Sequence, residues 1–367
     1  MRIAQIAPLW EAVPPTLYGG TERVVSFITE ELVRQGHDVT LFASGDSATS
    51  ARLISTCPEA LRLTRGIANY DAPLVTMLER AFAATEEFDL IHSHLEFLPF
   101  PLARRCRLPV LTTLHARLDQ PELLPVFRKF ADLPLVSVSD AQREPMLWAN
   151  WHKTIHPGLP ATLYRPHFEP GKYLVFLGRI APEKGLEQAI AVAQRVGMPL
   201  RIGARIDPAP MDYYRAVIEP LLDNPLIEFV GEVTDAEKDD FLGDAYALIA
   251  PYERPEPFGL VFIESLACGT PIIAYRRGSV PEVVEQGTTG FLCHSLDQMA
   301  QAIDLIPLLD RTDCRRSFER RFTVERMVQE YVGLYRQLTG QTDEPPLLRP
   351  QPSVDASALS SASVPMG

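Results

Sequence analysis

The chain has 367 residues, of which 46% are hydrophobic, and its formal net charge is −12. This length exceeds that of one ordinary domain, and the apolar content is ample for two cores. Because the balance of charge is acidic and no face is strongly basic, we do not expect nucleic acid as a partner.

Cysteine use and the first residues bear on the cellular compartment. The five cysteines are odd in number and none has CxxC spacing, so they indicate reduced thiols and neither a disulfide frame nor a zinc site. The sequence opens with a strand-like run, MRIAQIAPLW, so we expect no signal peptide, and it holds no apolar run long enough to span a bilayer. We therefore expect a cytoplasmic protein.

Residues 1–160 alternate between strand and helix patterns, which predicts a parallel sheet and a first domain. A helix follows Thr21 as its N-cap and stops at Gly36, and further helices are expected over 73–88 and from 141. The GxGxxG fingerprint of dinucleotide-binding folds is absent. The expected strands span residues 2–7, 38–43, 89–94, 109–114 and 135–138.

Two features of this first half are candidates for ligand contact. Gly19 and Gly20 follow a proline-rich loop, and they form either a flexible turn or a backbone that closely approaches a ligand. The strand ends carry His94, His115 and Ser139, which should meet at one edge of the sheet. Each histidine is either a structural hydrogen-bonding group or a reactive one. His92 and His94 have poor spacing for zinc.

We interpret residues 161–171, rich in proline, as a linker to a second domain over 172–322. A helix over 323–340 and a disordered tail over 341–367 complete the chain. Strands are expected at 173–177, 200–202, 227–230, 246–250, 272–275 and 290–292, and helices at 186–196, 211–222, 235–244, 281–285, 296–309, 315–322 and 324–338.

Two stretches of the second half combine charge with strand-to-helix junctions. Arg179 and Lys184 follow a strand and precede a helix, where cations hold phosphate, although a solvated charged turn would look similar. In residues 249–271 a proline-rich turn leads into a helix expected from Phe258 or Gly259 to Gly269. Glu256 lies before this helix and Glu264 within it; each is either solvated or part of a ligand site.

Three motifs, GRIAPEKG, PYERPEPFGLVFIESLACGTPII and GSVPEVVEQGTTGFL, resemble in order the signature of the family 4 glycosyltransferases, which are retaining enzymes of the GT-B fold. The resemblance extends from residue 1 to about 338, more loosely in the first half through the Gly19-Gly20 loop, DLIHSH and TTLH. It implies an α/β protein of two doubly wound, Rossmann-like domains that face a deep cleft, with a C-terminal helix that crosses back to the first domain.

The resemblance also implies a role for each candidate residue. Arg179 and Lys184 would grip the donor diphosphate, Glu256 would orient the sugar, and Glu264 would accept hydrogen bonds from the ribose. Val233 would lie beside the base, and His115 would face the reacting side of the sugar. Backbone groups near the sugar and phosphate would come from the remaining positions: Gly19, Gly20, Phe258, Gly259 and Leu260.

The implied reaction moves a hexose from a UDP- or GDP-sugar to a hydroxyl acceptor, which is a sugar, a lipid-linked sugar or a small molecule. Two cations and a helix N-terminus stabilise the leaving diphosphate, so no metal ligand set and no cofactor are expected. The alternatives are a sugar-nucleotide epimerase and a non-catalytic sugar-nucleotide-binding protein. The short basic runs at 102–109 and 127–130 predict at most peripheral membrane contact.

Overall fold

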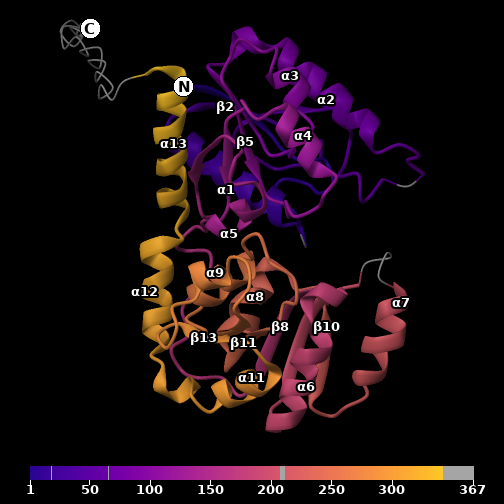
Figure 1. Ribbon diagram of the computed structural model, residues 1–367, viewed down its shortest axis with the longest axis vertical. Coiled ribbons are helices and arrows are strands. Elements are labelled where there is room, and N and C mark those ends of the chain that lie inside the picture. The colour runs from indigo at the N-terminus through magenta and orange to yellow at the C-terminus, as the bar shows by residue number, and fades with distance from the viewer. Residues whose placement is uncertain (18, 65, 207–210, 342–367) are drawn as a thin grey trace, which may run out of the picture.

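The computed structural model describes residues 1–17, 19–64, 66–206 and 211–341, and its strands form two parallel sheets, one in each half of the chain (Figure 1). The first sheet has the order β3-β2-β1-β4-β5-β6-β7 and the second the order β10-β9-β8-β11-β12-β13. In both sheets the strand order reverses beside the first strand of that half. Ligands bind at this switch point, beyond the carboxyl ends of the strands.

The first sheet is covered by helices on both faces, so its central strands are buried. They combine apolar residues with buried polar ones, among them Gln5, His92 and Thr113. Its strands are β1 (Arg2–Ile6), β2 (Asp38–Ala43), β3 (Arg52–Ser55), β4 (Leu90–Ser93), β5 (Val110–Leu114), β6 (Leu135–Ser137) and β7 (Trp151–Thr154). Its helices are α1 (Gly20–Arg34), α2 (Asp71–Ala83), α3 (Phe100–Ala103), α4 (Leu123–Lys129) and α5 (Asp140–Arg143).

The second sheet repeats this plan around a larger apolar core. Its strands are β8 (Leu174–Arg179), β9 (Leu200–Arg205), β10 (Ile227–Gly231), β11 (Ala247–Ala250), β12 (Ile272–Tyr275) and β13 (Gly290–Cys293). Its helices are α6 (Leu186–Val196), α7 (Met211–Tyr213), α8 (Asp235–Gly243), α9 (Leu260–Ala267), α10 (Val280–Val283), α11 (Leu296–Ile303) and α12 (Arg311–Arg321).

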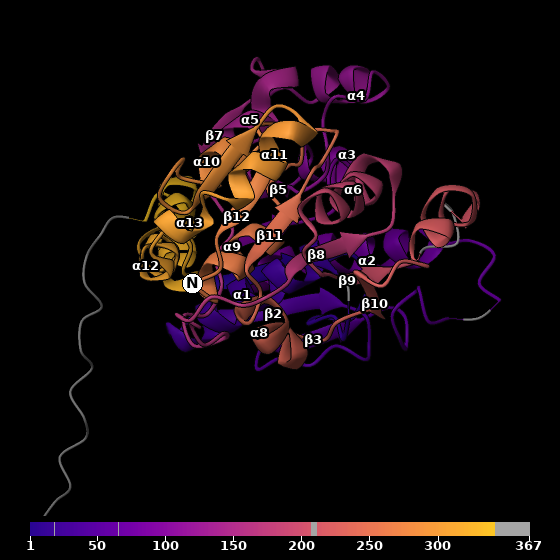
Figure 2. The ribbon, with the colours of Figure 1, turned by 90° about the horizontal axis from the view of Figure 1, so that it is seen from below.

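The last helix, α13 (Val324–Thr339), leaves the second half and runs along the first (Figure 1). Figure 2 shows α12 and α13 at the same side of the molecule. Its buried face, which includes Met327, Tyr331 and Tyr335, joins the core formed by Ile3 and α1. The expected crossing of this helix is thus confirmed. None of the described helices has the length and apolar character needed to cross a lipid bilayer.

Several predicted boundaries were wrong. Helix α1 begins at Gly20 with Gly19 as its N-cap, so Thr21 lies inside the helix and is not the cap. Strand β8 continues to Arg179, which therefore ends a strand and does not lie in a loop. Strands β3 and β7 were missed because neither is a run of buried apolar residues. The predicted disordered tail lies outside the described residues, except for its first residue.

Candidate active site

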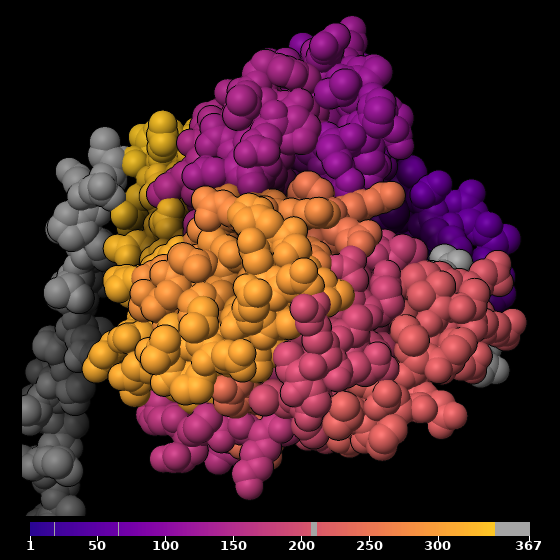
Figure 3. Space-filling view, turned by 60° about the horizontal axis from the view of Figure 1, so that its bottom comes forward, coloured from indigo at the N-terminus to yellow at the C-terminus, as the bar shows by residue number. Residues whose placement is uncertain are grey.

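A pocket of about 730 Å³ is lined by residues of both halves of the chain. In Figure 3 the first half (indigo to magenta) rests on the second (pink to orange), and the last helices (yellow) lie along one side. The pocket brings together all eleven residues to which the resemblance assigned a role: Gly19, Gly20, His115, Arg179, Lys184, Val233, Glu256, Phe258, Gly259, Leu260 and Glu264.

The two candidate phosphate-binding cations reach the pocket from β8 and the turn that follows it. Arg179 closes the strand, and its Nη2 donates to Glu183 Oε1 at 2.9 Å. Lys184 ends a short 3₁₀ turn over Pro182–Lys184. Its Nζ donates to Glu256 Oε2 at 2.7 Å and lies 4.1 Å from the centre of the Tyr252 ring. Because the lysine is only 7% exposed, the carboxylate and the ring stabilise a cation that would otherwise be poorly solvated.

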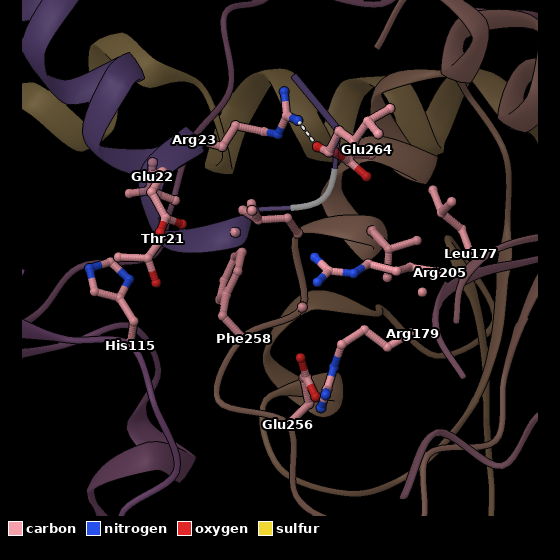
Figure 4. A pocket seen from close by; sticks show the side chains of 18 of the residues that line it. Thr21, Glu22, Arg23, His115, Leu177, Arg179, Arg205, Glu256, Phe258 and Glu264 are labelled. Carbon is pink, nitrogen blue, oxygen red and sulfur yellow. Dashed lines mark hydrogen bonds between the residues drawn. The ribbon is translucent and has the colours of Figure 1, made fainter. Parts of the chain in front are cut away.

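The loop that carries Glu256 and Phe258 is held from behind by the turn before α10. The Ser279 backbone N–H donates to the Glu256 carbonyl at 3.1 Å, and its hydroxyl donates to the Phe258 carbonyl at 2.7 Å. In Figure 4 the Arg179 side chain runs toward the Glu256 carboxylate. The loop therefore presents its carboxylate beside both cations from a fixed backbone.

Gly259 sets the direction in which α9 begins. Its φ is +81°, a left-handed value, and a Cβ there would lie 2.5 Å from the Phe262 ring. Leu260 and Val261, the first residues of α9, line the pocket together with Gly259. The first turn of the helix, whose amides lack partners within the helix, therefore begins at the pocket wall, a suitable place for an anion.

Glu264 lies in the middle of α9 and is 3% exposed. Its Oε1 accepts a hydrogen bond from Lys238 Nζ at 2.7 Å, and this lysine of α8 is itself close to Asp235. The ion pair explains how a carboxylate can be buried at the pocket wall. Val233, which precedes α8, lines the same pocket.

His115 follows β5 and enters the pocket from the first half (Figure 4). Its Nε2 lies 2.9 Å from Nδ1 of His94, and its backbone N–H donates to Glu96 Oε1 at 2.8 Å. The expected meeting of His94 and His115 is confirmed. Ser139 instead caps α5 by accepting from the Gln142 N–H at 3.0 Å, a structural role.

Gly19 is required for a contact within the protein itself. A Cβ on Gly19 would lie 2.7 Å from Pro15 Cβ, whereas a Cβ on Gly20 would meet nothing within 4 Å. The pair is therefore not simply a flexible turn. Gly19 lets the proline-rich loop pack against the start of α1, and Gly20 leaves the pocket wall open.

Sequence reasoning missed six charged residues of the pocket: Glu11, Glu22, Arg23, Arg205, Glu232 and Lys238. Three of them, Glu11, Arg23 and Arg205, take part in two ion pairs between the halves. Arg205 Nη1 lies 3.4 Å from Glu11 Oε1, and Arg23 pairs with Asp235 of α8. Arg205 ends β9 as Arg179 ends β8, so strand position was a usable signal. For Arg23 and Lys238, which look like ordinary helix residues, no such signal existed.

Glu22 lies in the first turn of α1 and is 5% exposed. Burial raises the pKa of its carboxyl to about 7, and the negative charge of nearby Glu11 acts in the same direction. The carboxyl is therefore partly protonated near neutral pH.

Within the described ranges, His167, Asp240 and Asp244 lie close enough together to bind a metal ion. None of these three residues lines the pocket.

Comparison with known proteins agrees with this geometry. Residues 18–152 match the family described as Glycosyltransferase Family 4, and residues 165–322 match the one described as Glycosyl transferases group 1. The chain belongs to the family 4 glycosyltransferases. As a member of this family it is a glycosyltransferase that uses a nucleotide-sugar donor.

Relatives of this family 4 glycosyltransferase include the D-inositol 3-phosphate glycosyltransferase of Mycobacterium marinum, which is 26% identical over 78% of this chain and 72% of the relative. The fold of the present chain is similar to that of the sucrose-phosphate synthase of Thermosynechococcus elongatus. The TM-score is 0.74, and the identity is 21% over 93% of this chain and 100% of the synthase. The fold is also similar to that of Anabaena HepE, solved with UDP and glucose, with a TM-score of 0.69 and 18% identity over 91% and 99%. These likenesses confirm the expected GT-B fold.

Proposed function

We propose that this glycosyltransferase moves a hexose from a UDP- or GDP-sugar to a hydroxyl acceptor with retention of anomeric configuration, and that it needs no metal ion. The observation that best supports this proposal is the position of Lys184. Its ammonium is buried at the pocket wall, 2.7 Å from Glu256, with Arg179 on the same side. This arrangement suits a diphosphate whose sugar lies beside a carboxylate.

In this proposal the donor spans the pocket along α9. The base lies near Val233, the ribose hydroxyls donate to Glu264, and the diphosphate lies between Lys184, Arg179 and the first turn of α9. The sugar hydroxyls then meet Glu256, and His115 approaches from the first half. Lys238 already occupies one oxygen of Glu264, so the ribose would use the other oxygen.

Charge placement carries the chemistry. As the bond between the sugar C1 and the phosphate oxygen breaks, negative charge grows on the diphosphate and positive charge on the sugar ring. The two cations and the helix N-terminus stabilise the departing oxygen. The acceptor oxygen attacks C1 from the same face, and its proton passes to the leaving phosphate. The new bond therefore keeps the configuration of the old one, and no enzyme nucleophile is required.

The test is a screen of UDP- and GDP-sugars by thermal shift, followed by incubation of the bound donors with hydroxyl acceptors. Nucleotide release and product mass are then measured. The proposal expects one donor whose nucleotide is released faster when an acceptor is present, with an unchanged anomeric configuration in the product. A converted sugar nucleotide without transfer would indicate an epimerase, and binding without any turnover would indicate a non-catalytic protein; either result overturns the proposal.

A further inference from the structure

A continuous line of buried polar side chains leads from His115 into the interior of the first half. His115 Nε2 lies 2.9 Å from His94 Nδ1, and His94 Nε2 lies 3.0 Å from Gln5 Oε1. The Gln5 amide Nε2 donates to the Tyr335 hydroxyl at 3.3 Å, and this hydroxyl lies 2.7 Å from Nδ1 of His92. The line thus joins a pocket residue to β1, β4 and the crossing helix α13.

Each histidine in this line carries one ring proton at neutral pH. Burial lowers the pKa of His115 to about 4 and that of His94 well below its usual range. Burial also lowers the pKa of His92 to about 3. A neutral imidazole has one donor and one acceptor nitrogen, so every hydrogen bond in the line determines the next.

Gln5 determines the direction of the line. Its amide nitrogen faces Tyr335, so its oxygen faces His94, and an amide oxygen only accepts. His94 therefore carries its proton on Nε2, and its bare Nδ1 accepts from His115. His115 in turn carries its proton on Nε2, which leaves Nδ1 as an acceptor. Figure 4 shows one ring nitrogen of His115 turned toward the pocket interior and the other turned away.

We propose that Gln5 and His94 are positioning residues that hold His115 with its proton on Nε2, so that its Nδ1 accepts a hydrogen bond from a hydroxyl of the bound sugar. The contact with the sugar rests on the proposed function, whereas the proton position is a property of the free protein. His94 is 1% exposed and Gln5 is 0% exposed, so neither touches the substrate and both act through His115.

The end of the line opposite His115 is formed by side chains of α13. Tyr335 lies on this helix, and a second tyrosine one turn earlier, Tyr331, has its hydroxyl 3.0 Å from Thr113 Oγ1. Thr113 in turn lies 2.8 Å from His92 Nε2. The line therefore ends at two tyrosine hydroxyl groups of the crossing helix. A hydroxyl can donate or accept a hydrogen bond, so it suits either tautomer of His92.

The first experiment determines which ring nitrogen of His115 carries the proton. In protein labelled with ¹⁵N-histidine, the ring nitrogen signals of His115 are assigned by their loss in His115→Gln. We expect the proton on Nε2 in the wild type and a mixture of both tautomers in Gln5→Met, which removes the amide at similar side-chain length. A proton on Nδ1 of wild-type His115, or an unchanged spectrum in Gln5→Met, would overturn the proposal whether or not the protein transfers sugar.

The second experiment uses kinetics to separate positioning from stability. Gln5→Met and His94→Phe are compared with Ile91→Val, a small core deletion in the same sheet that should leave kcat and KM unchanged. With the donor found in the screen, we expect kcat/KM to fall on the order of tenfold in the two variants, about the effect of one lost hydrogen bond. With a deoxy-sugar donor that lacks the hydroxyl held by His115, the same variants should lose nothing further.

Equal losses on the parent donor and on every deoxy donor would show that Gln5 and His94 only support the fold. That outcome would contradict the proposal while leaving the transferase assignment intact. Failure of all donors to react, combined with the expected tautomer in the spectrum, would instead contradict the proposed function alone.

Discussion

Lys184 and Glu256 form a direct ion pair across the donor side of the pocket, with 2.7 Å between Nζ and Oε2. The side chains are 9% and 25% exposed, so the lysine is the more deeply buried partner. Each residue therefore positions the other: the carboxylate offsets the buried positive charge, and the ammonium orients the carboxylate. The pair couples the proposed phosphate contact to the proposed sugar contact.

Replacing Lys184 with methionine should lower the transfer rate by about 10²–10³-fold, because one fixed charge beside the leaving group is lost. The methionine stem keeps most of the packing, so the melting temperature should change little. Initial rates of nucleotide release check the effect. Lys172→Met, at an exposed position just before β8, is the matched control, and wild-type turnover in Lys184→Met would refute the role of the lysine.

Chelation should leave activity unchanged, because two cations and a helix N-terminus supply the positive charge that a metal ion would otherwise bring. The measurement is the transfer rate after dialysis against EDTA, with and without added Mg²⁺. Loss of activity that Mg²⁺ restores would show that metal independence is wrong.

The buried pair Lys238–Glu264 should be strongly coupled in stability. Lys238→Met leaves a buried carboxylate unpaired and should lower the free energy of unfolding by about 3–5 kcal/mol. Adding Glu264→Gln should recover part of this loss, by about 1–3 kcal/mol of coupling. Denaturant unfolding measures the free energy of unfolding of the wild type, Lys238→Met, Glu264→Gln and the double variant. Lys153→Met, which breaks the more exposed pair with Glu330, should cost less than about 1 kcal/mol; additive losses at Lys238 and Glu264 would argue against coupling.

Glu22 should make stability depend on pH. Its folded pKa of about 7 lies above the ordinary value of 4.5, so between these values the folded protein keeps a proton that the unfolded chain releases. The free energy of unfolding therefore falls as the pH rises through this window. Relative to its value at pH 4.5, the stability of Glu22→Gln minus that of the wild type should increase by roughly 3 kcal/mol by pH 7.5. Both proteins retain Glu96, whose burial also raises its pKa to about 7, so the difference isolates Glu22.

Two glycines of the pocket should respond differently to alanine. At Gly20 an added methyl meets nothing and the helix gains a better former, so stability should hold or rise by up to about 1 kcal/mol. The methyl would project into the pocket and keep the donor from approaching the backbone closely. The donor KM should therefore rise on the order of tenfold, about the effect of one lost contact. Gly259→Ala is strained by its positive φ and by Phe262, so it should lose about 1–3 kcal/mol or more. Melting temperatures and donor KM values test both, and an unchanged KM in Gly20→Ala would exclude close approach of the donor there.

Much of the donor side could be predicted because its signals are local. Lys184, Glu256 and Gly259 lie within short segments in which a strand end, a proline or glycine turn and a helix start follow one another along the chain. Such junctions lie at the carboxyl edge of a parallel sheet whatever the rest of the fold does. The prediction that all these residues share one pocket therefore required only the fold class.

Other features were beyond reach of the sequence because they depend on segments far apart. Strand β7 is an edge strand with partly exposed residues, so no apolar period marks it. Nothing near Lys238 indicates that it neutralises Glu264, and nothing near Glu11 indicates that it meets Arg205 of the other half.

The sequence by itself determined the two parallel sheets, the family, and the residues at the donor end of the pocket, since period, turn chemistry and strand-end charges act over a few residues. Only the tertiary structure decided which buried charges are paired and how His115 is held. His94, which follows β4, contacts it directly, and Gln5 of β1 and Tyr335 of α13 extend the line; burial leaves each of them no solvent with which to form hydrogen bonds. Their roles follow from contacts across as many as 330 residues of chain, which no local pattern encodes.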